Sequence, residues 1–163
     1  MNNHSERAME LFKQGYNCSQ AVVAAFCEDI GIDLETSLKL SSSFGGGMGR
    51  LREVCGAVSG MFMVAGVKYG YSDPKDITSK TEHYKLIQEL ASRFKEGNRS
   101  IICRELLGVN QGPDSHIPEA RTNEYYKKRP CVELVGCAAQ IVEEMIASKQ
   151  NENIITEILK KDA

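Results

Sequence analysis

Residues 54–67 read VCGAVSGMFMVAGV and are apolar on every side of a helix. A helix that is apolar all round is buried in the middle of a domain, whereas a surface helix carries a polar face. The stretch is too short to span a bilayer, which takes about 20 apolar residues. Gly56 and Gly60 form a GxxxG step, which lets a neighbouring helix approach closely. The sequence therefore predicts a central helix surrounded by others.

The segments on either side repeat apolar residues at helical spacing, and no convincing pair of strands is found. Ser5, Asn17 and Asp33 are placed to cap the first three helices, and a long loop at 109–120 contains two prolines. With no internal repeat, residues 1–163 are predicted to be one domain, an all-α bundle of about seven helices. The helical segments expected beside the central one are 6–14, 18–30, 34–41, 76–96, 100–107, 130–149 and, packed loosely, 154–160.

The overall composition excludes several classes of partner. The chain has 163 residues, 42% of them hydrophobic, and a formal net charge of −2. A protein that binds nucleic acid or anionic membranes generally needs a basic excess, which is absent here. The N-terminal residues lack the apolar core of a signal peptide, and no charge-free run is long enough to span a bilayer. We therefore expect a cytoplasmic protein that binds neither nucleic acid nor membranes.

The six cysteines are not expected to form a disulfide framework, because thiols stay reduced in the cytoplasm. They are instead candidates for core residues, metal ligands or redox thiols. No C-x-x-C pair is present, which weakens both a thioredoxin-like and a zinc-ribbon interpretation.

Four of the cysteines fall in the first turn of a predicted helix. The free N–H groups and the positive dipole end of a helix stabilise a thiolate there, and the thiolate is the form that binds metals and reacts. Basic residues add to this effect, since Arg104 follows one of these cysteines and the run KKR at 127–129 precedes another. The other two, Cys27 and Cys137, lie within predicted helices and are expected to be small core residues. The four at helix starts are Cys18, Cys55, Cys103 and Cys131.

A glycine-rich stretch, FGGGMGRLREVCGAVSG at 44–60, surrounds one of these cysteines. It matches neither a P-loop nor a dinucleotide-binding fingerprint, because the required Lys-Ser/Thr pair and Gly-x-Gly-x-x-Gly spacing are missing. One interpretation is a loop that passes close over a cluster or substrate and directs backbone N–H groups at sulfur. The other is a long helix end followed by a tight turn, and the residues alone do not choose between the two. The residues expected to support the site are Gly45, Gly46, Gly47, Gly49, Arg50, Arg52, Gly56 and Arg104.

Five blocks occur in order: GYNCSQA at 15–21, FGGGMG at 44–49, CGAVSG at 55–60, CRELLG at 103–108 and PC at 130–131. With this set, the chain resembles the C_GCAxxG_C_C family of redox-active proteins over residues 15–146. By this resemblance, the four cysteines of the family correspond to Cys18, Cys55, Cys103 and Cys131, the four at helix starts. The resemblance implies a redox role, with iron as the cofactor. One departure lies beside the second cysteine: the family pattern has glycine before it and alanine after it, whereas here Val54 precedes it and Gly56 follows.

Three hypotheses follow for the four cysteines. In the first, the chain is an electron-transfer or oxidoreductase-type redox protein whose four thiolates bind an iron–sulfur cluster, with the arginines and the glycines offsetting its charge. A metal-free form of this hypothesis cycles two cysteines between dithiol and disulfide, and the metal form is preferred because a dithiol needs only two. In the second, the four hold a structural zinc ion. In the third, the chain is a helical interaction module with cysteines in its core. The GxxxG helix could also be buried in a homodimer, and the redox partner is left open.

Overall fold

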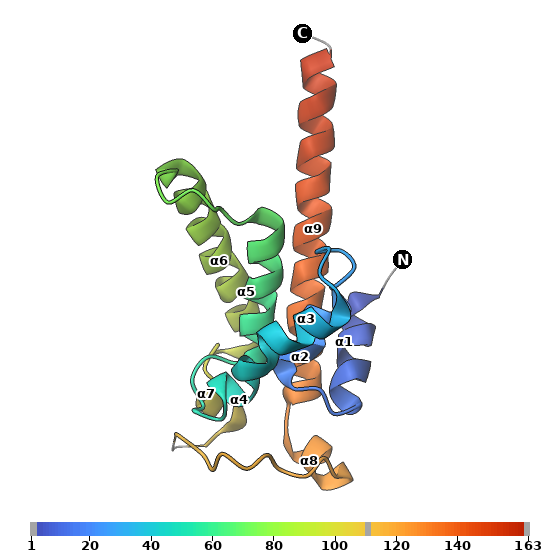
Figure 1. The fold of residues 1–163 in the computed structure, drawn as a ribbon, viewed down its shortest axis with the longest axis vertical. Coiled ribbons are helices and arrows are strands. Elements are labelled where there is room, and N and C mark those ends of the chain that lie inside the picture. The colour runs from blue at the N-terminus through green and yellow to red at the C-terminus, as the bar shows by residue number, and fades with distance from the viewer. Residues whose placement is uncertain (1–2, 110–111, 162–163) are drawn as a thin grey trace.

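The computed structural model describes residues 3–109 and 112–161. Within these ranges the protein is built from helices, and only an isolated bridge between Val54 and Ile102 has β geometry. The prediction of an all-α bundle is confirmed (Figure 1). The helices in chain order are α1 (His4–Lys13), α2 (Cys18–Ala25), α3 (Leu34–Ser41), α4 (Gly45–Met48), α5 (Gly56–Tyr69), α6 (Ile77–Asn98), α7 (Cys103–Leu107), α8 (Asn123–Lys128) and α9 (Cys131–Lys161), with a 3₁₀ turn at Ser42–Phe44.

Helix α5 forms the centre of the bundle, as its apolar sequence predicts. It packs against α2, α6 and α9, and its side chains Val58, Met61 and Val64 are fully buried. The GxxxG step faces α2, because a Cβ added at Gly60 would lie 3.0 Å from the backbone oxygen of Ser19. The missing side chains therefore allow α2 and α5 to pack closer together than other residues would permit.

Local capping sets the starts of α2 and α3. Asn17 accepts a hydrogen bond from the N–H of Gln20 at 2.9 Å, and the Gln20 side chain accepts one from the N–H of Asn17 at 3.1 Å. This reciprocal pair is a capping box. At α3, Asp33 accepts from the N–H of Thr36 at 2.9 Å. Both caps were expected from the sequence and are confirmed.

Two helix starts differ from the sequence prediction. Helix α1 is capped by the side chain of Asn3 rather than by Ser5. The Ser5 hydroxyl instead donates to the backbone oxygen of Gly136 in α9 at 2.9 Å, so a tertiary contact occupies the side chain that the sequence assigned to the cap. The helix predicted from residue 100 begins at Cys103, because Ile102 keeps extended backbone.

Helix ends also differ, and each difference has a local cause. Helix α2 stops at Ala25 rather than near residue 30, because Phe26 already leaves helical geometry. Helix α6 continues through Gly97 and ends at Asn98, because the next residue, Arg99, has a φ of 70°. The segments predicted at 130–149 and 154–160 form one helix, since the intervening QNEN contains no proline or glycine to interrupt it. Helix α8, capped by the Thr122 side chain, has no counterpart in the prediction.

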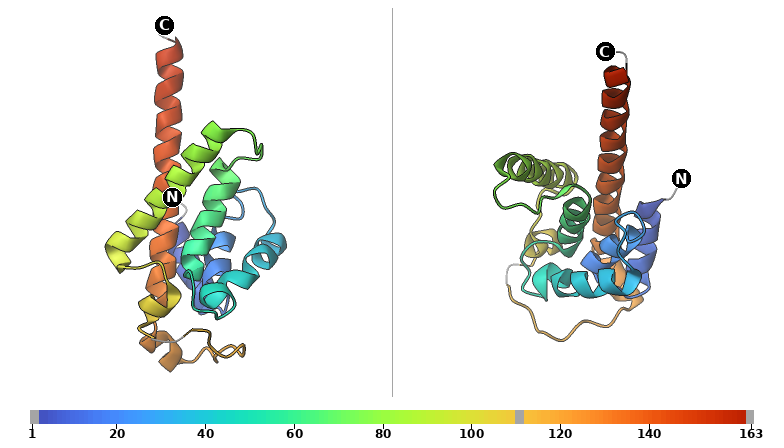
Figure 2. Two further views of the ribbon diagram at one scale, coloured as in Figure 1. Left: turned by 90° about the vertical axis from the view of Figure 1, so that its left-hand side faces the viewer. Right: turned by 45° about the horizontal axis from the view of Figure 1, so that its top comes forward.

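The short helices gather at one end of the molecule. Figures 1 and 2 show α4, α7, α8 and the loop before α8 at the end opposite to the C-terminal part of α9. The N-terminal part of α9 is buried in the bundle, whereas its C-terminal part extends beyond the other helices (Figure 1). The end that carries the short helices is the one at which the cysteines described below come together.

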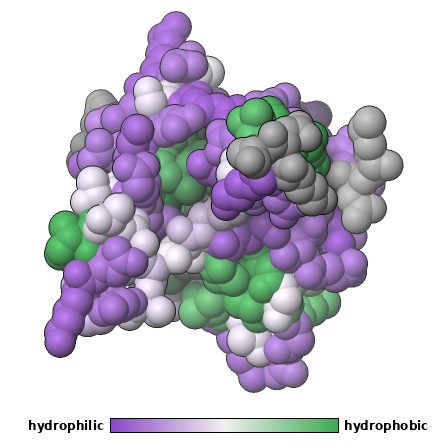
Figure 3. Space-filling view, turned by 90° about the horizontal axis from the view of Figure 1, so that it is seen from above, coloured by the Kyte–Doolittle hydropathy of each residue, from purple (hydrophilic) through white to green (hydrophobic). Residues whose placement is uncertain are grey.

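The opposite end has a mainly hydrophilic surface with separate hydrophobic patches (Figure 3). No helix within residues 3–109 and 112–161 is both long enough and apolar enough to cross a membrane. Four large aliphatic side chains near the end of α9 are more than half exposed: Ile154, Ile155, Ile158 and Leu159.

Candidate functional site

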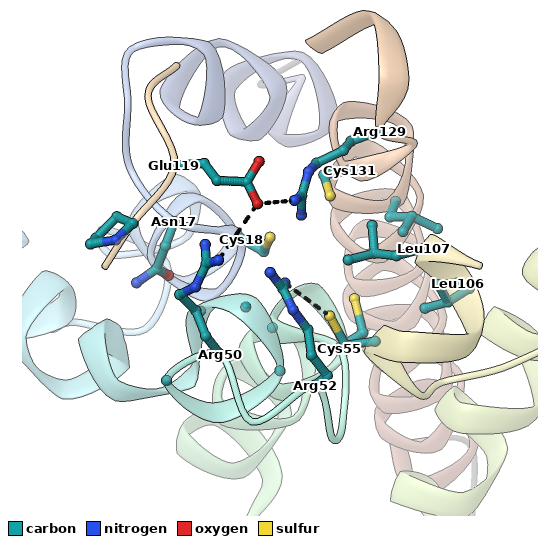
Figure 4. A pocket seen from close by; sticks show the side chains of 18 of the residues that line it. Asn17, Cys18, Arg50, Arg52, Cys55, Leu106, Leu107, Glu119, Arg129 and Cys131 are labelled. Carbon is teal, nitrogen blue, oxygen red and sulfur yellow. Dashed lines mark hydrogen bonds and ion pairs between the residues drawn. The ribbon is translucent and has the colours of Figure 1, made fainter. Parts of the chain in front are cut away.

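All four cysteines that the sequence places at helix starts line one pocket of about 250 Å³ (Figure 4). They come from separate elements: Cys18 from α2, Cys55 from the turn before α5, Cys103 from α7 and Cys131 from α9. Because these elements are far apart in the chain, only the fold brings the sulfurs to one place.

The remaining two cysteines lie outside the lining of this pocket. Cys27 is buried, with 5% of its surface exposed. Cys137 is half-buried and its sulfur accepts a hydrogen bond from the Asn98 side-chain amide at 3.3 Å. The structure thus separates the two groups of cysteines as the sequence does.

Each pocket cysteine lies at the N-terminus of a helix. Cys18, Cys103 and Cys131 are the first residues of α2, α7 and α9. Cys55 immediately precedes α5 rather than lying in its first turn, and its N–H donates to the backbone oxygen of Ile101 at 2.8 Å. The positive dipole ends of these helices therefore face the sulfurs and favour negative charge on them.

The glycine loop, which we define as residues 45–52, has an unusual backbone. Residues 46–50 all have φ between +60° and +68°, so they form a left-handed turn. A left-handed conformation costs about 1–2 kcal/mol for each residue that is not glycine. Met48, Arg50 and Arg52 nevertheless adopt positive φ. Strain of this kind persists only where the surrounding structure holds the segment in place.

Close contacts also require glycine in this loop. A Cβ added at Gly45 would lie 2.3 Å from a side-chain atom of Asn17, and one added at Gly47 would lie 2.6 Å from the Cβ of Cys103. The loop therefore passes directly against the pocket, as the first of the two interpretations of the glycine-rich stretch requires. The glycines that line the pocket are Gly45, Gly46, Gly47, Gly49 and Gly56.

Two arginines extend from the loop into the pocket (Figure 4). The Arg52 side chain is only 3% exposed, and it donates to the sulfur of Cys103 at 3.7 Å and to the carboxylate of Asp114 at 2.7 Å. Burial raises the pKa of Cys103, and the Arg52 guanidinium acts against that rise. Arg50 likewise binds Asp114, at 2.9 Å.

Other basic residues that the sequence singles out have different positions. Arg104 does not line the pocket, because its guanidinium pairs with Glu53 at 3.0 Å outside it. Of the basic run before Cys131, Arg129 lines the pocket. The supporting role expected for Arg104 therefore stays a prediction, whereas Arg129 is a lining residue of the pocket.

Comparison with known proteins adds the family. A family model described as "Putative redox-active protein (C_GCAxxG_C_C)" matches residues 16–145. The chain belongs to the C_GCAxxG_C_C family. The matched region includes the four pocket cysteines and the glycine loop, and the resemblance seen in the sequence is confirmed. No curated protein and no solved structure was found to match the chain.

In this C_GCAxxG_C_C protein, Arg121 also lines the pocket, although no motif in the sequence selects it. Its guanidinium donates to the backbone oxygens of Phe12 and Tyr16, both at 3.3 Å, and lies over the Phe12 ring at 4.4 Å. Among the described residues, no carboxylate forms an ion pair with it. Its positive charge is therefore available to groups in the pocket.

Acidic residues of the loop before α8 also reach the site. We call residues 112–120 the strap. Asp114 accepts from both Arg50 and Arg52, and Glu119 pairs with Arg129 and, at 3.5 Å, with Arg50. The Arg52 charge lowers the pKa of Asp114 to about 2, chiefly through the hydrogen bond between them. The sequence gives no local signal for these pairs, because Arg52 and Asp114 are 62 positions apart.

The four thiols of the C_GCAxxG_C_C site differ in pKa. A hydrogen bond from the Cys131 thiol lowers the pKa of Cys18 from 9.0 to about 7 against the effect of burial, and the Gly46 N–H and the Arg121 charge add to this lowering. The same hydrogen bond raises the pKa of Cys131. Burial raises the pKa of Cys55 to about 12. The pocket thus combines one thiol whose pKa is lowered with three whose pKa is raised.

The arrangement fits some metal groups better than others. Within residues 3–109 and 112–161, no three Cys, His, Asp or Glu side chains are placed to hold one metal ion. A structural zinc ion needs four ligands around a single point, with Zn–S distances of about 2.3 Å. In an iron–sulfur cluster, iron and sulfide occupy the space between the ligands, so the cysteines surround a cavity. In this structure four thiols line a pocket of about 250 Å³.

Proposed function

We propose that this chain is a redox protein in which the four pocket cysteines form one site and bind an iron–sulfur cluster. The observation that carries the proposal is the convergence of four cysteines, from four elements, on one pocket of about 250 Å³. A bound cluster supplies one-electron transfer over a range of potentials that the surrounding protein sets. Cys18, Cys55, Cys103 and Cys131 would hold it.

The charges around the pocket support an anionic occupant. Four thiolates give a cluster a negative charge, which must be balanced where water is scarce. Four arginines line the pocket, and two strap carboxylates pair with three of them, so positive charge is in excess. Those arginines are Arg50, Arg52, Arg121 and Arg129.

The protein's own residues would tune such a site through hydrogen bonds to sulfur. Arg52 donates to the sulfur of Cys103, and the backbone of Gly46 contributes to lowering the pKa of Cys18. Donors of this kind stabilise the more negative state and so raise the reduction potential. The glycine loop and the strap cover the sulfurs and limit the access of water, which acts on the potential as well.

The test is a spectrum with iron, sulfide and zinc analysis on protein purified without oxygen. We expect brown protein with charge-transfer bands in the visible region and stoichiometric iron and sulfide. Serine replacement of any one pocket cysteine should abolish the cluster, while Cys27→Ser and Cys137→Ser serve as matched controls that retain it. Full iron content in two of the four single pocket variants would refute the four-ligand proposal.

A second candidate is a metal-free dithiol formed by Cys18 and Cys131, favoured by the hydrogen bond that lowers the pKa of Cys18 to about 7. The Cys18 thiolate attacks a disulfide of the substrate, forming a mixed disulfide and releasing one substrate thiolate. Cys131 then loses its proton and attacks the Cys18 sulfur, which releases the second thiolate. Two electrons pass to the substrate, and a Cys18–Cys131 disulfide is left.

Peptide mapping of colourless, metal-free protein after oxidation distinguishes this candidate. A cross-link between Cys18 and Cys131, with the loss of two hydrogens from the intact mass, supports it. Cross-links that are absent, or that join other cysteines at random, exclude it. Iron-loaded protein in the first experiment would make the cluster the better description of the site.

A further inference from the structure

The strap forms part of the pocket wall, yet it contains no helix and every residue in it is exposed. It is attached to the glycine loop by backbone hydrogen bonds, since the N–H of Asp114 donates to the backbone oxygen of Arg50 at 2.9 Å. Arg50 in turn donates to the backbone oxygen of Ser115. Its other attachments to the pocket are the ion pairs of its two carboxylates.

Each strap carboxylate is shared between two pocket arginines. Asp114 lies 2.9 Å from Arg50 and 2.7 Å from Arg52, and Glu119 bridges Arg50 and Arg129 (Figure 4). Guanidinium groups are suited to such planar recognition of carboxylates and phosphates, because their N–H donors form a fixed fork. The arginines therefore form a binding arrangement for oxyanions that the strap fills.

Burial differs sharply between the two sides of these pairs. The arginine side chains are 15%, 3% and 18% exposed for Arg50, Arg52 and Arg129, whereas Asp114 and Glu119 are 41% and 45% exposed. The cations are thus built into the pocket. Glu119 lines it from an exposed segment, and Asp114 binds Arg50 and Arg52 from outside the lining. Ion pairs with one exposed partner are weak and are screened by salt, so an external anion can replace the carboxylates.

We infer that the pocket binds small molecules that carry an oxyanion, either a carboxylate or a phosphate, which takes the place of Glu119 in the pocket and of Asp114 on the arginines that both carboxylates bind. The strap carboxylates compete with this ligand and close the pocket when it is absent. Arg121, which pairs with no carboxylate in the described part of the chain, faces the same pocket and adds to its affinity for anions. Binding of the anion does not depend on the proposed redox function. Only its role as the substrate of the redox site rests on that proposal.

The test measures binding of inorganic phosphate and of succinate by calorimetry at low salt, with succinamide as a neutral control. In the Asp114→Asn/Glu119→Gln variant we expect about tenfold tighter binding, which corresponds to a strap that is closed for about nine-tenths of the time. Arg50→Gln and Arg129→Gln should weaken binding although they also release the strap. Glu124→Gln, an exposed carboxylate of α8 outside the pocket, is the matched control and should change nothing.

The outcomes are compared for variants that circular dichroism shows to be folded. Binding of phosphate alone or of succinate alone supports the inference and selects the class of oxyanion. Binding that is undetectable, or unchanged between the wild type and the Asp114→Asn/Glu119→Gln variant, overturns it. The same titration with iron analysis of the wild type separates the two proposals. Anion binding in wild-type protein that holds no iron and has no redox activity refutes only the proposed function, whereas iron-loaded protein that binds no anion refutes only this inference.

Discussion

Glycine serves different purposes in the glycine loop and in helix α5, which lie next to each other in the chain. In α5 the backbone is ordinary helix, and what matters at Gly60 is the missing side chain that lets α2 approach. In the loop, Gly47 combines a φ of +68° with a contact that no Cβ could make. The helix glycines thus stabilise the bundle, whereas the loop places strained backbone and buried cations against the cysteines at a cost in stability.

The largest effect should come from Gly47→Ala. The substitution adds strain from positive φ and places a Cβ 2.6 Å from that of Cys103, so we expect a loss of about 2–5 kcal/mol in the free energy of unfolding. Urea denaturation measures the loss. Gly31→Ala is the matched control, because its φ is +67° but nothing lies within 4 Å of the added Cβ. Equal losses at the two positions would show that the contact with Cys103 contributes nothing to the loss in the free energy of unfolding.

A smaller effect is expected in α5. Gly60→Ala places a Cβ 3.0 Å from the backbone oxygen of Ser19, and overpacking should outweigh the gain in helix propensity by about 1–2 kcal/mol. Gly66→Ala in the same helix meets nothing within 4 Å and should stabilise the protein by roughly 0.5–1 kcal/mol. If Gly60→Ala stabilised the protein, the packing of α2 against α5 would not depend on the missing side chain at this position.

The smallest effect is expected from the lowered pKa of Cys18, to which the glycine loop contributes. Since the pKa of Cys18 is lowered from 9.0 to about 7, this thiol holds fewer protons in the folded protein than in the unfolded chain between pH 7 and 9, and the raised pKa values of the other three pocket thiols oppose this only as the pH approaches 9. Its stability should therefore rise with pH across this window and be lost as the pH falls through 7. In reduced, metal-free protein the rate of alkylation by iodoacetamide should rise with pH with a midpoint at about 7. Cys18→Ser should remove the pH dependence of both the stability and the alkylation rate across this window. An alkylation midpoint near 9 would contradict the hydrogen bonds assigned to this sulfur.

The parts of the fold that the sequence predicts well depend on neighbouring residues. Asn17 and Asp33 cap their helices through side chains only three positions away from the N–H groups they accept. Of the helices that begin at the pocket cysteines, α2 has such a cap, whereas α5 and α7 begin without a side-chain cap. Local rules of this kind were sufficient to separate the four pocket cysteines from Cys27 and Cys137.

The parts that could not be predicted depend on distant residues. Ser5 makes a tertiary contact with Gly136, 131 positions away, rather than capping its helix. The strap carboxylates and Arg121 find their partners across the pocket, and no spacing in the sequence encodes those contacts. The continuity of α9 through QNEN follows from the absence of a breaker, which is a weaker signal than the presence of one.

The origin of the four cysteines in four separate elements has a consequence for the lifetime of the protein. A link between Cys18 and Cys131, through a bond or a shared group, closes most of the chain into a single loop. In the chain-entropy description, closing a loop of about 100 residues stabilises the folded state by roughly 4.7 kcal/mol. Molecules linked in this way open less often and resist proteolysis longer than unlinked ones. The lifetime of each molecule would then depend on whether its pocket cysteines are linked.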